Sequence, residues 1–375
     1  TELVSIFESQ VISRHIDIYA RELKDNGECF YTIGSSGHEG NAVFGRLFPY
    51  SDIAFLHYRS APFFLERSRQ IPNSTPIHDT ALSFMASSED PISGGRHKVI
   101  GSEKLNIPPQ TSTIASHLPK AVGTAFSIDR AKDLSLSEGK LSNESIVLCS
   151  FGDASTNHAT ALSAFNTACW ISSQGGHVPI VFICEDNGTG ISVPTDGKWI
   201  ENNFSNRYGM EYLKADGLHL IDLIIQATKA EKICRIKRVP IFLHMKTVRL
   251  MGHAGSDVEV GYRDIKDIEE DERNDPLMHS ARIMIENSCL TKEEVVSLYE
   301  KTRTQVGHVF ENAISRPKLK KVSEVMASIV SNKHTRTRPK YPSKNLREKT
   351  FGKEFSRTNL PHHMGKLINY ALTDI

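Results

Sequence analysis

The sequence lacks the features that mark membrane and secreted proteins. No apolar run approaches the roughly 20 residues of a membrane-spanning helix. The first residues, TELVSIFESQ, have no basic start followed by an apolar core, so they are not typical of a secretory signal. Neither sign of charge is in excess, since Lys and Arg number 45, Asp and Glu number 44, and the formal net charge is +1. We therefore expect a cytoplasmic protein, or a mitochondrial-matrix protein if the source is eukaryotic, with neither nucleic acid nor a membrane as its main partner.

Two common site signatures are also missing. None of the six cysteines stands in a C-x-x-C pair, which argues against a structural zinc site. Several lie in apolar runs such as LCSFGD and FICEDNG, so they are expected to be reduced thiols in the core. The glycine-rich segments IGSSGHEG and NGTGIS both fail the G-x-G-x-x-G pattern, so a nicotinamide-dependent dehydrogenase loses its main support.

The sequence does contain an alternation of apolar strands and helices. Continuous apolar runs at 145–151, 178–187 and 239–249 predict strands that are buried on both faces. The segments between these runs have helical patterns. The alternation predicts an α/β fold with a doubly wound, mainly parallel sheet and helices on both faces. Elsewhere the predicted elements are a helix over 3–23, a short helix after 33–40, irregular loops over 68–111, and a capped helix that begins at Thr291.

Polar residues stand at the ends of two of the predicted strands. Asp153 lies two residues after the first strand, and Asn187 is the last residue of the second, with Gly188 next to it. Ligands of doubly wound sheets bind at the carboxyl ends of the strands, and carboxylate, amide and carbonyl oxygens suit Mg²⁺ together with a diphosphate. A tight strand-to-helix turn with Asp153 as a helix cap explains the first motif equally well. The spacing alone leaves both interpretations open.

Longer motifs around these residues resemble a known family. The segments GDASTNHATALSAFNTA and ICEDNGTGISVPT resemble the thiamine-diphosphate motif. More narrowly, the chain resembles the α subunit of the decarboxylating component of 2-oxo acid dehydrogenase complexes, of the pyruvate and branched-chain types. The segments GHEG, HYRSA, SHLPKAVG and TVRLMGHAGSD fall in the same order as in that family, between about Gly37 and Asp257. The resemblance implies the thiamine-diphosphate-binding fold, with thiamine diphosphate and Mg²⁺ as cofactors.

The resemblance also assigns roles to individual residues. It implies that Mg²⁺ is held by the side chains of Asp153 and Asn187 and by the carbonyl of Thr189. It places His253 over the diphosphate and the reacting carbon, as the catalytic residue of this chain. The other implied cofactor contacts are Tyr58 and Arg59 at the diphosphate, Ser112, Ile114 by its backbone and by holding the cofactor rings in a bent shape, and the backbone N–H groups of Ala154 and Ser155.

The chain departs from the family pattern at several of these positions. Ala154 stands where the motif has glycine, and Thr189 stands where the family often has tyrosine. Glu185 matches the pyruvate type, whereas the branched-chain type has arginine there. Ala254 follows His253, so the phosphorylation that regulates animal pyruvate enzymes is excluded at that position. We expect a backbone carbonyl to serve at Thr189, and Ala154 to fit if its φ is negative.

The implied activity is the oxidative decarboxylation of a 2-oxo acid with transfer of the acyl group to lipoamide, in a multienzyme complex. The implied partners are a β subunit or fused β domain, in an α2β2 heterotetramer or a dimer of fused chains, and the lipoyl domain of the acyltransferase component. The glutamate that activates thiamine diphosphate belongs to the β part in this family. Two alternatives stay open: a cofactor-binding subunit without catalysis, and a Mg²⁺-dependent phosphohydrolase that uses Asp153.

The predicted domain layout has three parts. Residues 1–330 form the cofactor-binding α domain, and 331–358, rich in Lys, Arg and Pro, form a basic linker. The final segment, LPHHMGKLINYALTDI, resembles the opening of a family β subunit. Residues 359–375 are therefore expected to start a β-type domain, although a simple C-terminal helix explains them too.

Overall fold

The computed structural model describes residues 2–29, 33–134, 142, 144–329, 343–352 and 360–373. These residues divide into two compact units, Thr1–Leu319 and Lys320–Ile375. Within the described residues, no helix has both the length and the apolar character needed to cross a bilayer. The first unit contains all the sheet strands and every predicted site residue.

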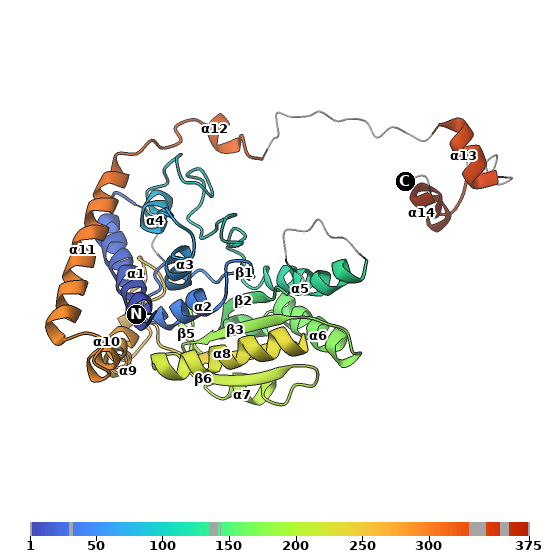
Figure 1. The fold of residues 1–375 in the computed structure, drawn as a ribbon. Helices are drawn as coiled ribbons and strands as arrows, with labels where there is room; N and C mark the ends of the chain where they lie inside the picture. Colours follow the sequence, from blue (N-terminus) through green and yellow to red (C-terminus); the bar gives the residue numbers. More distant parts are fainter. Residues whose placement is uncertain are drawn as a thin grey trace. The chain divides into compact units, whose positions relative to one another are not determined.

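The first unit is built on a five-stranded parallel sheet with the order β1-β2-β3-β7-β6 (Figure 1). The three predicted strands are confirmed as β2, β3 and β7, and they occupy the centre of the sheet. Two further strands were not predicted, namely β1 and β6 at the two edges. The bounds are β1 Ile53–Phe55, β2 Val147–Gly152, β3 Ile180–Asp186, β6 Glu211–Asp216 and β7 Ile241–Lys246.

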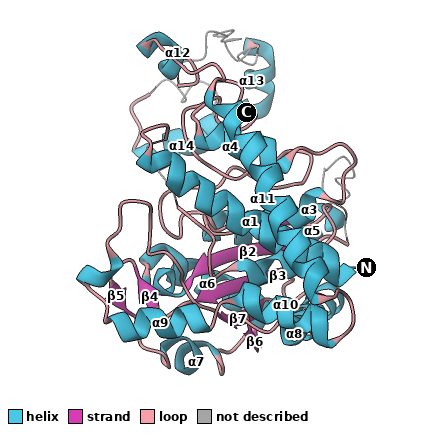
Figure 2. Ribbon diagram, turned by 90° about the vertical axis from the view of Figure 1, so that its left-hand side faces the viewer, coloured by secondary structure: helices cyan, strands magenta, loops and turns pink. Residues whose placement is uncertain are grey.

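Helices cover both faces of this sheet, as predicted (Figures 1 and 2). Because side chains alternate along a strand, Leu148 packs on one face of β2 while Val147 and Cys149 pack on the other. The Leu148 face is covered by α1, α2, α3 and α8, and the opposite face by α5, α6 and α7. Their bounds are α1 Glu2–Asp25, α2 Ala42–Leu47, α3 Ala61–Ser68, α5 Leu118–Asp133, α6 Ala159–Ser173, α7 Trp199–Phe204 and α8 Leu220–Lys237.

Three of the remaining helices of the first unit lie in segments for which no helix was predicted. Helix α4 (Pro76–Phe84) lies within 68–111, which was predicted to be irregular. Helices α9 (Ile265–Arg273) and α10 (Pro276–Glu286) lie between Gly252 and Thr291, where no element was predicted. The capping box at Thr291 is confirmed, because its hydroxyl accepts the Glu294 N–H at the start of α11 (Lys292–Ile314).

The described residues of the second unit form three short helices. These are α12 (Val322–Met326), α13 (Lys344–Phe351) and α14 (Met364–Thr373). The basic linker predicted for 331–358 lies largely outside the described residues, and its described part, 343–352, contains α13. Helix α14 forms within the segment predicted to start a β-type domain.

Candidate functional site

The predicted metal ligands lie at neighbouring strand ends. Strands β2 and β3 pair in parallel with Gly152 opposite Glu185, so Asp153 and Asn187 follow at the same edge of the sheet. After β2 the chain turns into the short 3-10 helix η2 (Asp153–Asn157). After β3 it forms a small hairpin of β4 (Thr189–Gly190) and β5 (Val193–Pro194), which is separate from the main sheet (Figure 2). The register of the parallel strands therefore positions these two residues.

The carboxyl group of Asp153 is buried. One of its oxygens accepts a hydrogen bond from the Thr195 hydroxyl at 2.5 Å. Burial raises its pKa, and the nearby carboxylate of Asp186 adds to the rise. A buried carboxylate with a raised pKa gains from a cation, because the cation stabilises its charged form. The environment of Asp153 therefore fits a metal ligand.

The side chain of Asn187 is held at both ends of its amide. Its Oδ1 accepts the backbone N–H of Thr189 at 3.0 Å, and its Nδ2 lies 3.0 Å from Nε2 of His38. The other ring nitrogen of His38 lies 2.6 Å from the buried carboxylate of Glu185. When neutral His38 donates to Glu185 through Nδ1, its Nε2 accepts from Asn187. This chain of hydrogen bonds fixes which end of the amide presents oxygen.

The alanine at position 154 is accommodated by a glycine across the site. A Cβ added at Gly190 would lie 2.8 Å from the Cβ of Ala154, closer than real Cβ atoms come. Gly190→Ala is therefore expected to lower the free energy of unfolding by about 1–3 kcal/mol through overpacking. The double variant Ala154→Gly with Gly190→Ala removes the clash and restores stability, as urea unfolding of the wild type and the two variants checks. If the double variant is as unstable as the single one, the contact does not explain the glycine.

Tyr58, Arg59 and His253 come together on the other side of the site. Arg59 is buried, and its guanidinium donates to the carbonyl of His253 at 3.1 Å and lies 3.2 Å from Nδ1 of that residue. The rings of Tyr58 and His253 meet edge to face, with centroids 6.1 Å apart. A cavity of about 300 Å³ lies beside them and is also lined by Ser112 and Ile114. Four predicted residues thus share one cavity.

The remaining predicted residues lie outside that cavity. Asp153 and Ala154 line a second cavity of about 400 Å³, beside η2 and the β4–β5 hairpin. Ser155 is buried within η2, and Asn187 and Thr189 are partly buried in the loop after β3. The predicted site residues therefore form two groups. One lies at the strand ends and includes the proposed metal ligands, and the other lies around Arg59.

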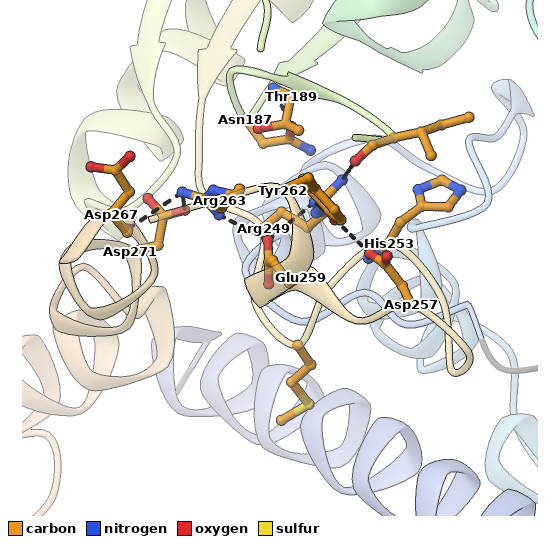
Figure 3. A network of polar contacts seen from close by, with 12 residues as sticks. Asn187, Thr189, Arg249, His253, Asp257, Glu259, Tyr262, Arg263, Asp267 and Asp271 are labelled. Atoms are coloured by element: carbon orange, nitrogen blue, oxygen red, sulfur yellow. Dashed lines mark hydrogen bonds and ion pairs between the residues drawn. The ribbon is translucent and has the colours of Figure 1, made fainter. Parts of the chain in front are cut away.

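A network around the buried Arg249 orders the loop that carries His253 (Figure 3). Arg249 donates to the carbonyl of Ile191 at 2.6 Å, to Glu259 at 3.1 Å and to the Tyr262 hydroxyl at 2.7 Å. The Tyr262 hydroxyl donates in turn to Asp257, whose same oxygen accepts the backbone N–H of His253 at 2.7 Å. These hydrogen bonds therefore connect the loop to the hairpin after β3 and fix the backbone of His253 within the loop. The sequence alone did not identify Arg249.

The imidazole of His253 is held in its neutral form. Burial lowers its pKa to about 4, and the cations of Arg59 and Arg249 act in the same direction. Because this pKa lies below the ordinary value of 6.5, the unfolded chain binds a proton at His253 between pH 6.5 and 4, whereas the folded chain does not. The free energy of unfolding therefore decreases as the pH falls through this range. Neutral His253 leaves Nδ1 free to accept from Arg59.

His253→Gln is expected to reduce the loss of stability between pH 7 and pH 5 by about 1–2 kcal/mol. Urea unfolding of the wild type and the variant at both pH values measures the difference. The comparison is needed because burial also lowers the pKa of His38, His57 and His117, and these residues add to the slope in both proteins. Equal slopes in the two proteins would mean that His253 titrates normally.

One buried cluster near the site was not predicted. His38, His57 and Glu185 place their polar atoms within 4.8 Å of one another. The hydrogen bond between His38 and Glu185 already uses one ligand atom from each. The two residues are far apart in sequence, so no local motif could have identified the pair. We interpret it as support for Asn187.

Comparisons with known proteins agree with this geometry. A family model described as "Dehydrogenase E1 component" matches residues 8–322. The 2-oxoisovalerate dehydrogenase subunit alpha of Bacillus subtilis is 23% identical over 322 residues, which cover 84% of this chain and 92% of that protein. The mitochondrial 2-oxoisovalerate dehydrogenase subunit alpha of Caenorhabditis elegans is 25% identical over 81% of this chain and 68% of its own length. The mitochondrial pyruvate dehydrogenase E1 component subunit alpha of Dictyostelium discoideum is 27% identical over 46% of this chain and 45% of its own length.

Proposed function

The chain belongs to the dehydrogenase E1 component family, and on this premise we propose that it binds Mg²⁺ and thiamine diphosphate as the α part of a 2-oxo acid dehydrogenase. The observation that carries the proposal is the position of Asp153 and Asn187 at adjacent ends of parallel strands. The reaction proposed is the oxidative decarboxylation of a 2-oxo acid with acyl transfer to lipoamide. Thiamine diphosphate, when bound, supplies the carbanion chemistry of this reaction.

The residues at the strand ends fit Mg²⁺. Asp153 and Asn187 offer a carboxylate and an amide oxygen, and Thr189 offers a carbonyl from the loop between them. Mg²⁺ prefers such hard oxygen ligands and takes its remaining ligands from water and phosphate. Burial raises the pKa of Asp153, so a bound cation would stabilise its charged form. The task of these residues is to hold the metal and thereby the diphosphate.

The second group of residues fits an anionic, aromatic cofactor. Arg59 and Tyr58 offer a guanidinium and a hydroxyl for the diphosphate, and Ala154 and Ser155 offer backbone N–H groups. Ser112 and Ile114 line the same cavity as Tyr58, which supports our expectation that they contact the cofactor rings. Neutral His253, whose Nδ1 accepts from Arg59, carries its proton on Nε2 and can donate that proton beside the reacting carbon.

The proposal requires a partner. The family resemblance implies that the glutamate that activates the cofactor belongs to the β part, so we assign it to a β subunit or a fused β domain. In this layout residues 1–330 form the α domain, 331–358 a basic linker, and 359–375 the start of a β-type domain. The acyl group would leave on the lipoyl domain of an acyltransferase component, which approaches the loop of His253.

Calorimetric titration with thiamine diphosphate tests the proposal. The chain, with its β partner, is expected to bind the cofactor only when Mg²⁺ is present, because the oxygen ligands hold the diphosphate through the metal. Cofactor binding without decarboxylation of any 2-oxo acid would indicate a binding subunit without catalysis. Hydrolysis of a phosphate ester without thiamine diphosphate would favour the phosphohydrolase alternative and contradict the proposal.

A further inference from the structure

Lys98 is a partly buried cation without a direct counter-ion. It lies in the connection between α4 and α5, and its ammonium is 4.7 Å from the centre of the Phe84 ring. Within the part of the chain that the structure describes, the ammonium has neither a hydrogen-bond acceptor nor an ion-pair partner. Asp17 is the acid whose field reaches it, but the Asp17 Oδ2 already accepts the N–H groups of Ser35 and Ser36. Lys98 therefore lacks a direct anionic partner.

The ammonium belongs to the cavity that Tyr58 and His253 line. Three isoleucines form its apolar wall, and Lys98 and Gln110 add polar groups. The described residues that line it include no carboxylate. An anion that enters this cavity meets an uncompensated positive charge next to an apolar surface. This combination suits a ligand with a short carbon chain that ends in a negative group.

The electrostatic environment of Lys98 favours the same kind of ligand. Burial lowers the pKa of Lys98 to about 8, the Arg59 cation acts in the same direction, and Asp17 acts against both. The ammonium form is thus held at a disadvantage by desolvation and by a like charge. A bound anion stabilises the charged form, because opposite charges at short distance in a partly dry site attract strongly.

We propose that Lys98 binds a second negative charge on the substrate, so that the site accepts a 2-oxo acid whose side chain carries a carboxylate. The inference rests on the proposed function, because it names the substrate class of that site. The proposed metal ligand Asp153 lies outside this cavity, and Arg59 does not line it. Tyr58 does line it and is proposed to contact the diphosphate, so the test below also measures thiamine diphosphate binding. Lys98 lies in the connection between α4 and α5, and its ammonium packs on the ring of Phe84 in α4. It is therefore available to the substrate.

Calorimetric titration of the α–β assembly, loaded with thiamine diphosphate and Mg²⁺, tests this assignment. The probes are glutarate and pentanoate, which have the same chain length and differ in one carboxylate. The wild type is expected to bind glutarate about tenfold more tightly than pentanoate, as one charge-assisted hydrogen bond provides. Lys98→Met should remove this preference, and Lys98→Arg should keep it. Lys104→Met, at an exposed lysine of the same connection, is the matched control and should change nothing.

Each other outcome has a definite meaning. Equal affinity for the two probes in the wild type would overturn the proposal. If Lys98→Met weakens both probes equally, Lys98 binds the carboxylate that all 2-oxo acids share, and the substrate class is wrong. If Lys98→Met weakens thiamine diphosphate instead, Lys98 is a diphosphate ligand, and the proposal is also overturned. A wild type that binds no thiamine diphosphate would contradict the proposed function, whereas a glutarate preference that depends on Lys98 would still support the anion site.

Discussion

Asp153→Asn is expected to weaken the Mg²⁺-dependent binding of thiamine diphosphate by about 100-fold or more. Mutation of residues that only hydrogen-bond to a metal ligand already weakens metal binding by about 10–100-fold, and the loss of a ligand should cost at least as much. Asparagine has the shape of aspartate, so it keeps the hydrogen bond with Thr195. The variant loses the negative charge of the carboxylate, which attracts the Mg²⁺ cation. Calorimetric titration with saturating Mg²⁺ measures the change.

The stability of the same variant separates a functional role from a structural one. Burial raises the pKa of Asp153, so its ionised form opposes folding at neutral pH when no metal is bound. Asp153→Asn should therefore unfold at the same urea concentration as the wild type or at a higher one. Asp196→Asn is the matched control, because Asp196 lines the same cavity and caps a nearby turn, where it accepts the N–H of Lys198. A loss of cofactor binding in the control as large as in Asp153→Asn would refute the assignment.

Arg249→Met is expected to lower the free energy of unfolding by about 3–5 kcal/mol, because it leaves buried partners without their cation. The variant also frees the carbonyl of Ile191, which has a left-handed backbone conformation with φ of 58° that is strained for a β-branched residue. The loop of His253 should then exchange its amide hydrogens faster. Urea unfolding and hydrogen exchange over residues 250–263 measure the two effects.

Two controls separate the causes of that loss. Glu259→Gln in the Arg249→Met background should cost at most about 1 kcal/mol more, because the Glu259 carboxylate keeps its ion pair with Arg263 at 2.9 Å after Arg249 is removed. Arg273→Met should cost less than about 0.5 kcal/mol, because Arg273 pairs with Glu270 on the exposed surface. If Arg249→Met behaves like Arg273→Met, the network in Figure 3 does not order the loop.

The central part of the fold was predictable because its signals are local and strong. Strands β2, β3 and β7 are buried on both faces, so each reads as an unbroken apolar run. The edge strands give weaker signals. Strand β1 has three residues, and β6 (EYLKAD) buries only alternate side chains. In α9 no residue is buried, so its sequence has no apolar stripe to detect.

The site divides in the same way. Asp153 and Asn187 were predictable because parallel strands bring their carboxyl ends to one edge, whatever the length of the helix between them. The residues that support them were not predictable, since they meet through tertiary structure. His38 and Glu185, for example, are 147 positions apart. Arg59 and His253, which are 194 positions apart, were assigned only through the family resemblance. Lys98 lies in a segment without regular pattern, so only the cavity distinguishes it from a surface lysine.

The most direct measurement is the anomalous diffraction of Mn²⁺ in crystals of the α–β assembly grown with thiamine diphosphate. Mn²⁺ takes the oxygen ligands that Mg²⁺ uses and can be located without ambiguity. Under the proposed assignment of the metal site, we expect one anomalous peak in coordination contact with the side chains of Asp153 and Asn187 and with the carbonyl of Thr189, next to the diphosphate. A peak among His38, His57 and Glu185, or a diphosphate bound without metal at Asp153, would contradict it.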